Sequence, residues 1–285
     1  MEMTYRKLCE LFDAAHIESA EWDALCLMEH FCGVSHSLLR AAPDRNYENA
    51  ALEDAVRRRL SHEPLQYILG EWEFYRQKYE VSPNCLIPRA DTEILVETAI
   101  RLLPLGAHFA DLCTGSGCIA ISTLAERPDT TALALEKFPN TLELAMRNAK
   151  RNGVDARFMG ILSDVLASHP TLEGTPFDAI LSNPPYIPTK DIEELSPEVH
   201  KEPFVALDGG ADGLLFYRAI LKNYKPLLKA DGFFLFEIGF DQAAALTTLA
   251  KEHNFAHVRV LRDFGGNDRV VYISDIPFDE RRTIL

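Results

Sequence analysis

The stretch DLCTGSGCIA, residues 111–120, decides the fold that we expect for this chain. Its first residues complete an apolar run, HFADLC (108–113), that is typical of a β-strand, and its last residues lead into a helix. Between them, Gly115 and Gly117 let the backbone approach a ligand closely, and the N-terminus of a helix presents free N–H groups. This succession of strand, turn and helix predicts the ligand-binding edge of an α/β sheet.

Strand-like apolar runs recur through the rest of the chain and alternate with helical segments. One helix is expected to begin at Pro139 and to end at Gly153. The further runs are TALALE (131–136), RFMG (157–160), FDAILS (177–182), GFFLFEI (232–238), HVRVL (257–261) and RVVYI (269–273). This alternation predicts a Rossmann-like, doubly wound and mainly parallel sheet. Because the last two runs flank the turn-rich segment DFGGND (263–268), we expect the last strand to pair antiparallel.

The first 75 residues differ from this pattern, because their apolar positions have a helical period. One helix can be capped by Ser19 and ends at Gly33, and a clearer one covers residues 47–61. The segment QYILGEWEFYRQKYEVSPNCLIP (66–88) is rich in aromatic residues and indicates a connecting β-hairpin. We therefore expect a small all-α domain over residues 1–75, a hairpin linker over 76–88 and an α/β domain over 89–285.

The composition limits the classes of partner and compartment. The 285 residues carry a net charge of −14, which argues against a partner that is held mainly through phosphates, so no direct DNA binding is expected. No apolar run approaches membrane-spanning length, and we expect a cytoplasmic protein that does not bind a membrane. The six cysteines are scattered and fit reduced thiols. Cys26, His30, Cys32 and His36 match no standard zinc module, so no metal is expected.

A carboxylate follows the glycine turn at the spacing of a nucleotide site. Glu136 ends the next strand, where it can accept hydrogen bonds from two ribose hydroxyls. However, Gly115, Gly117 and Ala120 also satisfy the dinucleotide fingerprint G-x-G-x-x-A. NAD and S-adenosylmethionine therefore both remain possible from this motif alone. A second acid, Asp164, follows the third strand, where it could bind an adenine amino group, and this favours the methyl donor without deciding the matter.

The segment SNPPYIP (182–188) separates these two cofactors. Pro184 forces Asn183 away from helical geometry, and Pro185 restrains Pro184 in the same way. The resulting rigid, extended segment holds the Asn183 side-chain carbonyl and the Pro184 backbone carbonyl as two acceptors for a planar –NH2 group. Tyr186 can lie against the face of that group. An amide nitrogen held in this way has more electron density and a fixed lone-pair direction, which suits methyl transfer but not hydride transfer.

The two motifs together resemble those of a known enzyme family. The pattern D-x-x-T-G-S-G (111–117) followed by N-P-P-Y (183–186) is similar to class I S-adenosylmethionine-dependent methyltransferases that act on amino groups of planar substrates. Within that class, the chain resembles the release factor glutamine methyltransferase family nearly end to end. The other matching segments are PLQYILGEWEFY (64–75), IPRADTEILVE (87–97), EPFVALDGGADGL (202–214) and DFGGNDRVV (263–271).

This resemblance implies a function and a set of site residues. The implied reaction is N5-methylation of the glutamine in the Gly-Gly-Gln motif of class-1 peptide chain release factors, with a helical N-terminal domain that docks the protein substrate. The residues implied to hold S-adenosylmethionine are Asp111, Cys113, Thr114, Gly115, Ser116, Gly117, Glu136 and Asn183, with Asp164 and Val165 near the adenine. Those implied to hold the substrate amide are Asn183, Pro184, Pro185 and Tyr186, of which Asn183, Pro184 and Tyr186 are the expected catalytic residues. We expect a monomer.

The chain departs from the family pattern at three positions. Ala90 stands where a proline is usual, Val165 where larger apolar residues are common, and Cys113 where many relatives have glycine. These departures concern the packing around the adenine rather than the reaction.

Three other functions share part of the pattern. Adenine-N6 DNA methyltransferases also have N-P-P-Y, but they need base flipping and a basic channel, whereas this chain is acidic. A sibling family methylates a glutamine of a ribosomal protein. A non-catalytic docking module is the third alternative, and the intact Asn183 and Glu136 argue against it.

Overall fold

A computed structural model describes residues 3–167 and 176–278 of the chain. The chain divides into two compact units: Met1–Glu71 with Leu195–Glu202, and Trp72–Glu194 with Pro203–Leu285. The first unit ends before the boundary that the sequence suggested at residue 75. It also includes a short segment from much later in the chain, which no local pattern indicates.

The first unit is built from helices. They are α1 (Tyr5–Ala14), α2 (Ala20–Cys32), α3 (His36–Ala41), α4 (Ala50–Leu60) and α5 (Leu65–Leu69). Gly33 ends α2 as predicted, in the left-handed conformation with a φ of 66°. Ser19 precedes α2, but its hydroxyl donates to the Asp23 carboxylate instead of capping the backbone. The helix predicted over 47–61 begins later, because the Asn49 side chain accepts hydrogen bonds from two N–H groups of its first turn.

A buried ion pair joins the later segment to these helices. The Arg59 side chain on α4 is only 5% exposed, and it donates to Asp23 at 2.6 Å and to Glu198 at 3.0 Å. His62 lies 3.2 Å from the same Glu198 carboxylate. Because a buried charge is costly unless it is paired, these contacts hold residues 195–202 in the first unit.

A short β-hairpin follows the helices. Its strands are β1 (Glu71–Phe74) and β2 (Gln77–Glu80), so it lies within the aromatic-rich segment 66–88 that predicted it, although its first strand precedes the linker range 76–88. Tyr75 and Arg76 form the turn with φ values of 44° and 65°. Positive φ at both turn residues matches the twist of a two-residue hairpin, although neither residue is a glycine or an asparagine. The hairpin predicted within residues 66–88 is therefore confirmed, but its turn does not use the residues that usually mark one.

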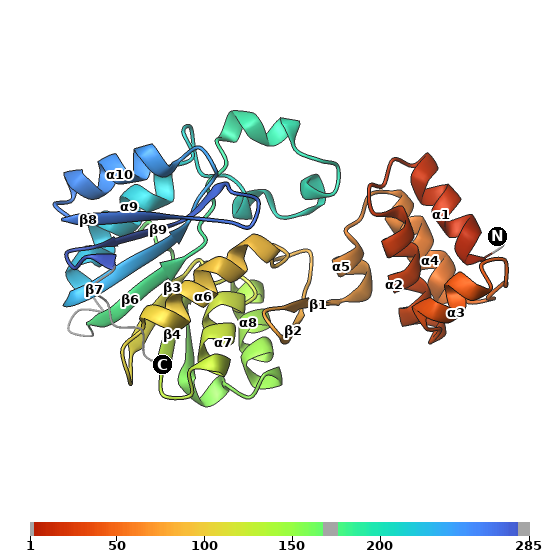
Figure 1. Cartoon of the computed structure of the whole chain (residues 1–285), viewed down its shortest axis with the longest axis horizontal. Helices are drawn as coiled ribbons and strands as arrows, with labels where there is room; N and C mark the ends of the chain where they lie inside the picture. Colours follow the sequence, from red (N-terminus) through yellow and green to blue (C-terminus); the bar gives the residue numbers. More distant parts are fainter. Residues whose placement is uncertain (1–2, 168–175, 279–285) are drawn as a thin grey trace. The chain divides into compact units, whose positions relative to one another are not determined.

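The second unit contains a seven-stranded sheet in the order β5-β4-β3-β6-β7-β9-β8 (Figure 1). Its strands are β3 (His108–Leu112), β4 (Thr131–Glu136), β5 (Phe158–Leu162), β6 (Phe177–Ser182), β7 (Leu228–Glu237), β8 (His257–Arg262) and β9 (Asp268–Ser274). Strands β3 to β7 pair in parallel, and β9 runs antiparallel to both β7 and β8. The predicted mixed, doubly wound sheet with an antiparallel last strand is confirmed.

Helices cover both faces of this sheet (Figure 1). One face carries α6 (Glu93–Leu102), α7 (Cys118–Glu126) and α8 (Pro139–Arg151), and the other carries α9 (Leu215–Tyr224) and α10 (Ala243–Glu252). Short 3-10 helices occupy Ala90–Thr92, Asp155–Arg157, Thr189–Glu194, Val199–Lys201, Phe204–Ala206 and Lys225–Leu227. Because both faces are covered, every residue of β6 is buried, which explains its continuous apolar sequence.

Within the described part of the chain, no helix combines the length and the apolar character needed to cross a membrane.

Candidate active site

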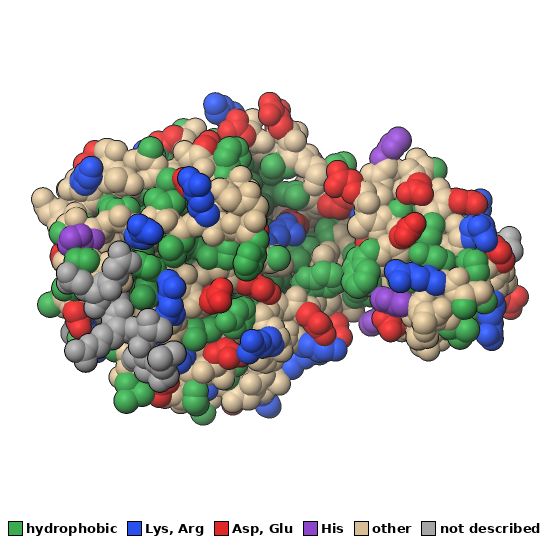
Figure 2. All heavy atoms as spheres, viewed as in Figure 1, with side chains coloured by type: hydrophobic (Ala, Val, Ile, Leu, Met, Phe, Trp, Pro, Cys, Tyr) green, Lys and Arg blue, Asp and Glu red, His purple; other side chains and the backbone are tan. Residues whose placement is uncertain are grey.

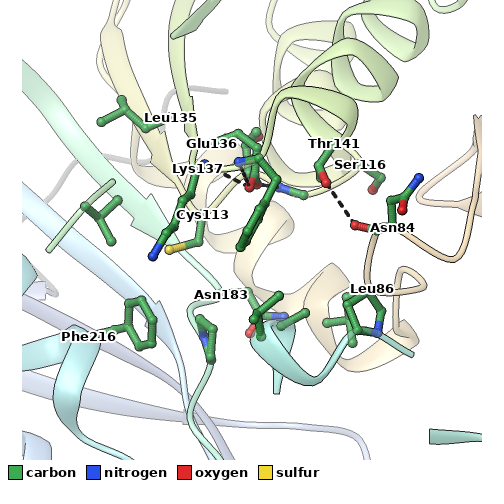
Figure 3. Close-up of a pocket in the computed structure, with 18 of the residues that line it drawn as sticks. Asn84, Leu86, Cys113, Ser116, Leu135, Glu136, Lys137, Thr141, Asn183 and Phe216 are labelled. Carbon is green, nitrogen blue, oxygen red and sulfur yellow. Dashed lines mark hydrogen bonds between the residues drawn. The ribbon is translucent and has the colours of Figure 1, made fainter. Parts of the chain in front are cut away.

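The carboxyl ends of the parallel strands meet at one edge of the sheet, and a cavity of about 260 Å³ lies there. Figure 3 shows Cys113, Glu136 and Asn183 around this cavity, each just after or at the end of a different strand. Of the predicted site residues, those that line it are Cys113, Thr114, Gly115, Ser116, Glu136, Asp164, Val165, Asn183 and Pro185. The sequence therefore identified side chains from β3, β4, β5 and β6 that the fold brings together.

Other lining residues come from two segments that the sequence had matched only through the family resemblance. The segment before α6 contributes Asn84, Leu86, Ile87, Pro88, Arg89 and Thr92. The segment before α9 contributes Pro203, Phe204, Val205, Ala206 and Asp208. The start of α8 supplies Thr141, whose hydroxyl donates to the Asn84 carbonyl at 2.8 Å (Figure 3). These segments add apolar side chains, such as Leu86 and Phe204, and also polar ones, such as Arg89 and Asp208, to the lining.

Asp111 lies beneath the glycine turn rather than in the lining. Its side chain is 0% exposed, and Oδ2 accepts hydrogen bonds from the Thr114 hydroxyl at 2.6 Å and the Ala120 N–H at 3.2 Å. Oδ1 is buried and has no hydrogen-bond partner among the described residues. Burial raises the pKa of Asp111 to about 7, although the two hydrogen bonds lower it. Because Asp111 is buried and outside the lining, it could act on a ligand only through its charge, which a nearby cation would stabilise.

The turn itself needs glycine at Gly117. This residue precedes α7 with a φ of 82°, and a Cβ there would lie 2.6 Å from the Cδ1 atom of Ile121. Cys113 also has a positive φ, 59°, which is uncommon for a residue with a side chain. The backbone thus keeps the left-handed geometry at position 113 that a glycine adopts more readily.

Glu136 is held at the end of β4 by three backbone N–H groups. Its Oε1 accepts from Lys137 at 2.8 Å and Phe138 at 3.0 Å, and its Oε2 accepts from Gly115 at 3.1 Å. Burial raises its pKa, and these hydrogen bonds lower it. The carboxylate is therefore fixed with lone pairs still available to hydroxyl donors at the cavity.

The two residues expected near an adenine lie together after β5. Asp164 accepts a hydrogen bond from the Leu166 N–H at 3.0 Å and pairs with Lys137 at 2.9 Å. Val165 is 4% exposed and packs in the core on the face that carries α9 and α10.

The Asn183–Tyr186 segment is rigidly placed. The Asn183 Nδ2 group donates to the Thr92 hydroxyl at 3.3 Å, which leaves the side-chain carbonyl oxygen as the acceptor for a ligand. The Tyr186 backbone carbonyl accepts from the Gln242 side chain at 2.9 Å. Gly209 packs so closely that a Cβ there would lie 2.7 Å from the Tyr186 Cα. Asn183 and Pro185 line the cavity, whereas Pro184 and Tyr186 lie beside them in the chain and outside the lining.

Sequence reasoning missed one residue of this arrangement. Glu237, at the end of β7, is 1% exposed, and the Tyr186 hydroxyl donates to its Oε1 at 3.5 Å. A carboxylate at the carboxyl end of a parallel strand is the same signal that identified Glu136, so it could have been found.

This geometry can bind a ligand through two carboxylates and a glycine turn, and it can orient a planar amide through fixed acceptors. In the described residues, no three His, Cys, Asp or Glu side chains are arranged to hold a metal ion. The chemistry that these groups offer is orientation and charge, rather than nucleophilic attack by a protein side chain.

Comparisons with known proteins give consistent matches. A family model described as "PrmC N-terminal domain" matches residues 4–70, and one described as "Methyltransferase small domain" matches residues 90–202. The release factor glutamine methyltransferase of Geobacter sulfurreducens is 42% identical over 226 residues, which cover 79% of this chain and 78% of that protein. The protein of the same name from Caulobacter vibrioides is 35% identical over 263 residues, or 90% of each chain.

Solved structures add one relative and one fold likeness. The protein-(glutamine-N5) methyltransferase (release factor-specific) of Alicyclobacillus acidocaldarius is 32% identical and covers 68% of this chain and 98% of its own, with a TM-score of 0.41. The catalytic domain of hMettl16 has a TM-score of 0.59 at 14% identity over 82% of each chain, which shows a shared fold alone.

Proposed function

The chain belongs to the release factor glutamine methyltransferase family, and on that premise we propose that it methylates N5 of the glutamine in the Gly-Gly-Gln motif of class-1 peptide chain release factors, using S-adenosylmethionine. The observation that carries the proposal is the Asn183 amide, whose Nδ2 is engaged by Thr92 at 3.3 Å. A fixed carbonyl acceptor at the cavity is what a substrate –NH2 group requires.

The cavity fits the proposed cofactor. When bound, S-adenosylmethionine supplies a methyl group that is activated by a positively charged sulfur. Glu136, fixed by three backbone N–H groups, would accept hydrogen bonds from the ribose hydroxyls. The unmet Oδ1 of Asp111 lies behind the turn, where a cation would compensate its charge. Asp164 and Val165 would lie near the adenine.

The protein's part in the transfer is to orient the substrate amide. The Asn183 side-chain carbonyl and the Pro184 backbone carbonyl would accept its two hydrogens, which raises electron density on the nitrogen. An amide held in this way would direct its nitrogen lone pair toward the methyl group that the cofactor supplies, and the new N–C bond would replace the bond between methyl and sulfur. The N–H proton is lost afterwards, so no side chain needs to remove it beforehand. Tyr186 and Pro185 would exclude water from the amide.

The charge distribution does not favour a nucleic-acid substrate. The net charge is −14, and on the face shown in Figure 2 Lys and Arg side chains are interspersed with acidic and apolar ones. DNA-binding surfaces instead gather positive charge along the backbone path.

The decisive experiment is methyl transfer from labelled S-adenosylmethionine to an unmethylated class-1 release factor. The controls are a factor with Gly-Gly-Gln changed to Gly-Gly-Ala, a ribosomal-protein preparation, duplex DNA, and the Asn183→Ala variant. Label on the release factor alone, absent from the Ala control and from the variant, supports the proposal. Label on ribosomal protein or DNA instead would support methyl transfer to a planar –NH2 group by the N-P-P-Y segment, but it would overturn the proposed substrate. Cofactor binding without any transfer would favour a docking module.

We also propose that the first unit docks the release factor and that the protein acts as a cytoplasmic monomer. A docking role predicts a much lower KM for the whole factor than for a short Gly-Gly-Gln peptide, and equal values would contradict it. Light scattering in solution tests the monomer.

A further inference from the structure

Glu237 occupies a position directly beside the segment proposed to hold the substrate amide. Strands β6 and β7 are parallel neighbours, and Ser182 pairs with Phe236. Asn183 follows Ser182 and Glu237 follows Phe236, so these two residues lie side by side at the edge of the sheet. The Glu237 side chain is 1% exposed, and the Tyr186 hydroxyl donates to its Oε1 at 3.5 Å. Its Oε2 is buried and has no hydrogen-bond partner among the residues that the structure describes.

Thr92 links this carboxyl to Asn183. The Thr92 side chain is 2% exposed, and its oxygen accepts the hydrogen bond from Asn183 Nδ2 at 3.3 Å. A hydroxyl that accepts in this way still has its own hydrogen to donate. Thr92 and Asn183 both lie near enough to lower the pKa of Glu237, although no hydrogen bond joins them to Oε2. The Glu237 carboxyl therefore attracts the hydroxyl hydrogen of Thr92 and the Nδ2 hydrogens of Asn183.

We propose that Glu237 is a positioning residue, which fixes the side chains of Asn183 and Tyr186 for the methyl-accepting amide. It acts on Tyr186 directly and on Asn183 through Thr92. A negative charge at this point makes it costly for the Asn183 amide to turn over and present Nδ2 to the substrate. The inference rests on the proposed function for its role in turnover, but the orientation of Asn183 is a property of the protein alone.

The charges around Glu237 determine when it is ionised. Burial raises the pKa of Glu237 to about 7 in the ligand-free protein, although Thr92, Arg269 and Asn183 lower it, and Asp91 raises it further. Arg269 is shared, because its guanidinium pairs with Asp263 at 3.1 Å and with Asp91 at 3.3 Å. The other titratable groups that face Glu237 are Tyr186, Tyr217 and Cys118. The positioning is therefore complete above pH 7 and is lost below it.

The test replaces Glu237 by Gln, which keeps the shape and an acceptor for Tyr186 but removes the charge. With saturating cofactor, we expect kcat for the release factor to fall about tenfold to a hundredfold, with little change in KM. Wild-type kcat should rise with pH, with a midpoint at or below the value near 7 of the ligand-free protein because the bound positive charge favours the ionised carboxylate, and the variant should lose this rise. The matched control is Ser274→Ala, which removes a buried hydrogen bond to the Gly232 carbonyl on β7, far along the strand from Glu237, and should leave kcat unchanged.

A second measurement does not depend on activity. The side-chain 15N–1H2 resonances of Asn183, assigned by their loss in Asn183→Ala, should shift with a midpoint near pH 7 in the wild type and stay constant in Glu237→Gln. If wild-type protein methylates nothing but this titration is seen, the proposed function fails and the positioning role stands. If the resonances do not titrate, or if Glu237→Gln retains full kcat on a factor that the wild type methylates, the role of Glu237 is overturned.

Discussion

Replacing Asp111 by Asn should stabilise the protein much more at pH 8 than at pH 5. Burial raises the pKa of Asp111 from 3.8 to about 7, so the folded protein binds a proton that the unfolded chain has already released. This contribution to stability is complete below pH 3.8 and is lost as the pH rises through 7. Between pH 5 and pH 7 the wild type loses about 1.4 kcal/mol of stability per pH unit through this group. The free energy of unfolding of Asp111→Asn, relative to that of the wild type, should therefore increase by about 3 kcal/mol from pH 5 to pH 8.

The comparison between two pH values removes the other effects of the substitution. The Asn carbonyl can accept from Thr114 and Ala120 as Oδ2 does, but its –NH2 group replaces the unmet Oδ1 and stays buried. An unsatisfied buried group costs about 1–3 kcal/mol, and this cost is equal at pH 5 and pH 8. Other groups that change charge in this range, such as Glu237, are present in both proteins, so the difference between wild type and variant reports the charge of Asp111.

The assay is urea unfolding of the ligand-free protein, followed by tryptophan fluorescence. The chain has two tryptophans, so a Trp22→Phe background leaves Trp72 to report on the second unit. Asp129→Asn is the control of opposite sign. Arg127 donates to Asp129 at 2.8 Å and holds the pKa of that carboxyl far below its usual range, so its loss should destabilise the protein equally at both pH values. A change in free energy for Asp111→Asn that is equal at pH 5 and 8 would refute the raised pKa.

Three other substitutions test separate parts of the structure. Glu136→Ala should weaken S-adenosylmethionine binding by about 3 kcal/mol, or roughly a hundredfold, because two charge-assisted hydrogen bonds are lost, and an unchanged Kd in calorimetry would remove its ribose role. Gly117→Ala should destabilise the protein by about 2–3 kcal/mol in thermal unfolding, because a Cβ is strained at its φ of 82° and would also displace the Ile121 side chain, 2.6 Å away. Gly115 has a positive φ too, 57°, but its nearest contact is an ordinary 3.4 Å, so Gly115→Ala should cost only the backbone strain of about 1 kcal/mol. Arg59→Ala should cost the first unit about 3–5 kcal/mol by leaving a buried carboxylate unpaired, while the exposed Arg57→Ala should change its unfolding free energy by less than about 1 kcal/mol.

The buried strands were predictable because a strand covered on both faces is apolar at every position. The runs at 131–136 and 177–182 match β4 and β6 residue for residue. Where a strand leaves the core, this signal disappears. Strand β7 begins at Leu228, earlier than the apolar run at 232–238, and its first residues are exposed or half-buried. There only Leu228 pairs with β6, opposite Phe177, before the register shifts and pairing resumes at Phe233, and the side-chain pattern does not reveal this early pairing.

The candidate site shows the same division between local and distant information. Glu136 and Asn183 follow their strands directly, so their place at the sheet edge could be predicted from the order of elements. The partner of Asn183, by contrast, is Thr92, which lies 91 residues earlier in the chain. No periodicity or turn signal connects two such residues, because their contact arises only when α6 packs beside the sheet.

Three carboxylates, Asp111, Glu136 and Glu237, are buried near one edge of the sheet, and burial of a charge costs free energy unless hydrogen bonds compensate it. Glu136 has three backbone N–H donors, whereas Asp111 and Glu237 each keep a buried oxygen without a partner among the described residues. Charges left this way oppose folding above pH 7, so their presence is explained if a bound cation compensates them. A cofactor at a hundred times its Kd stabilises the folded state by about 2.7 kcal/mol. At equal cofactor concentration, the free energy of unfolding should therefore increase more for the wild type than for Asp111→Asn. Equal increases in the two proteins would mean that the Asp111 charge does not contribute to cofactor binding.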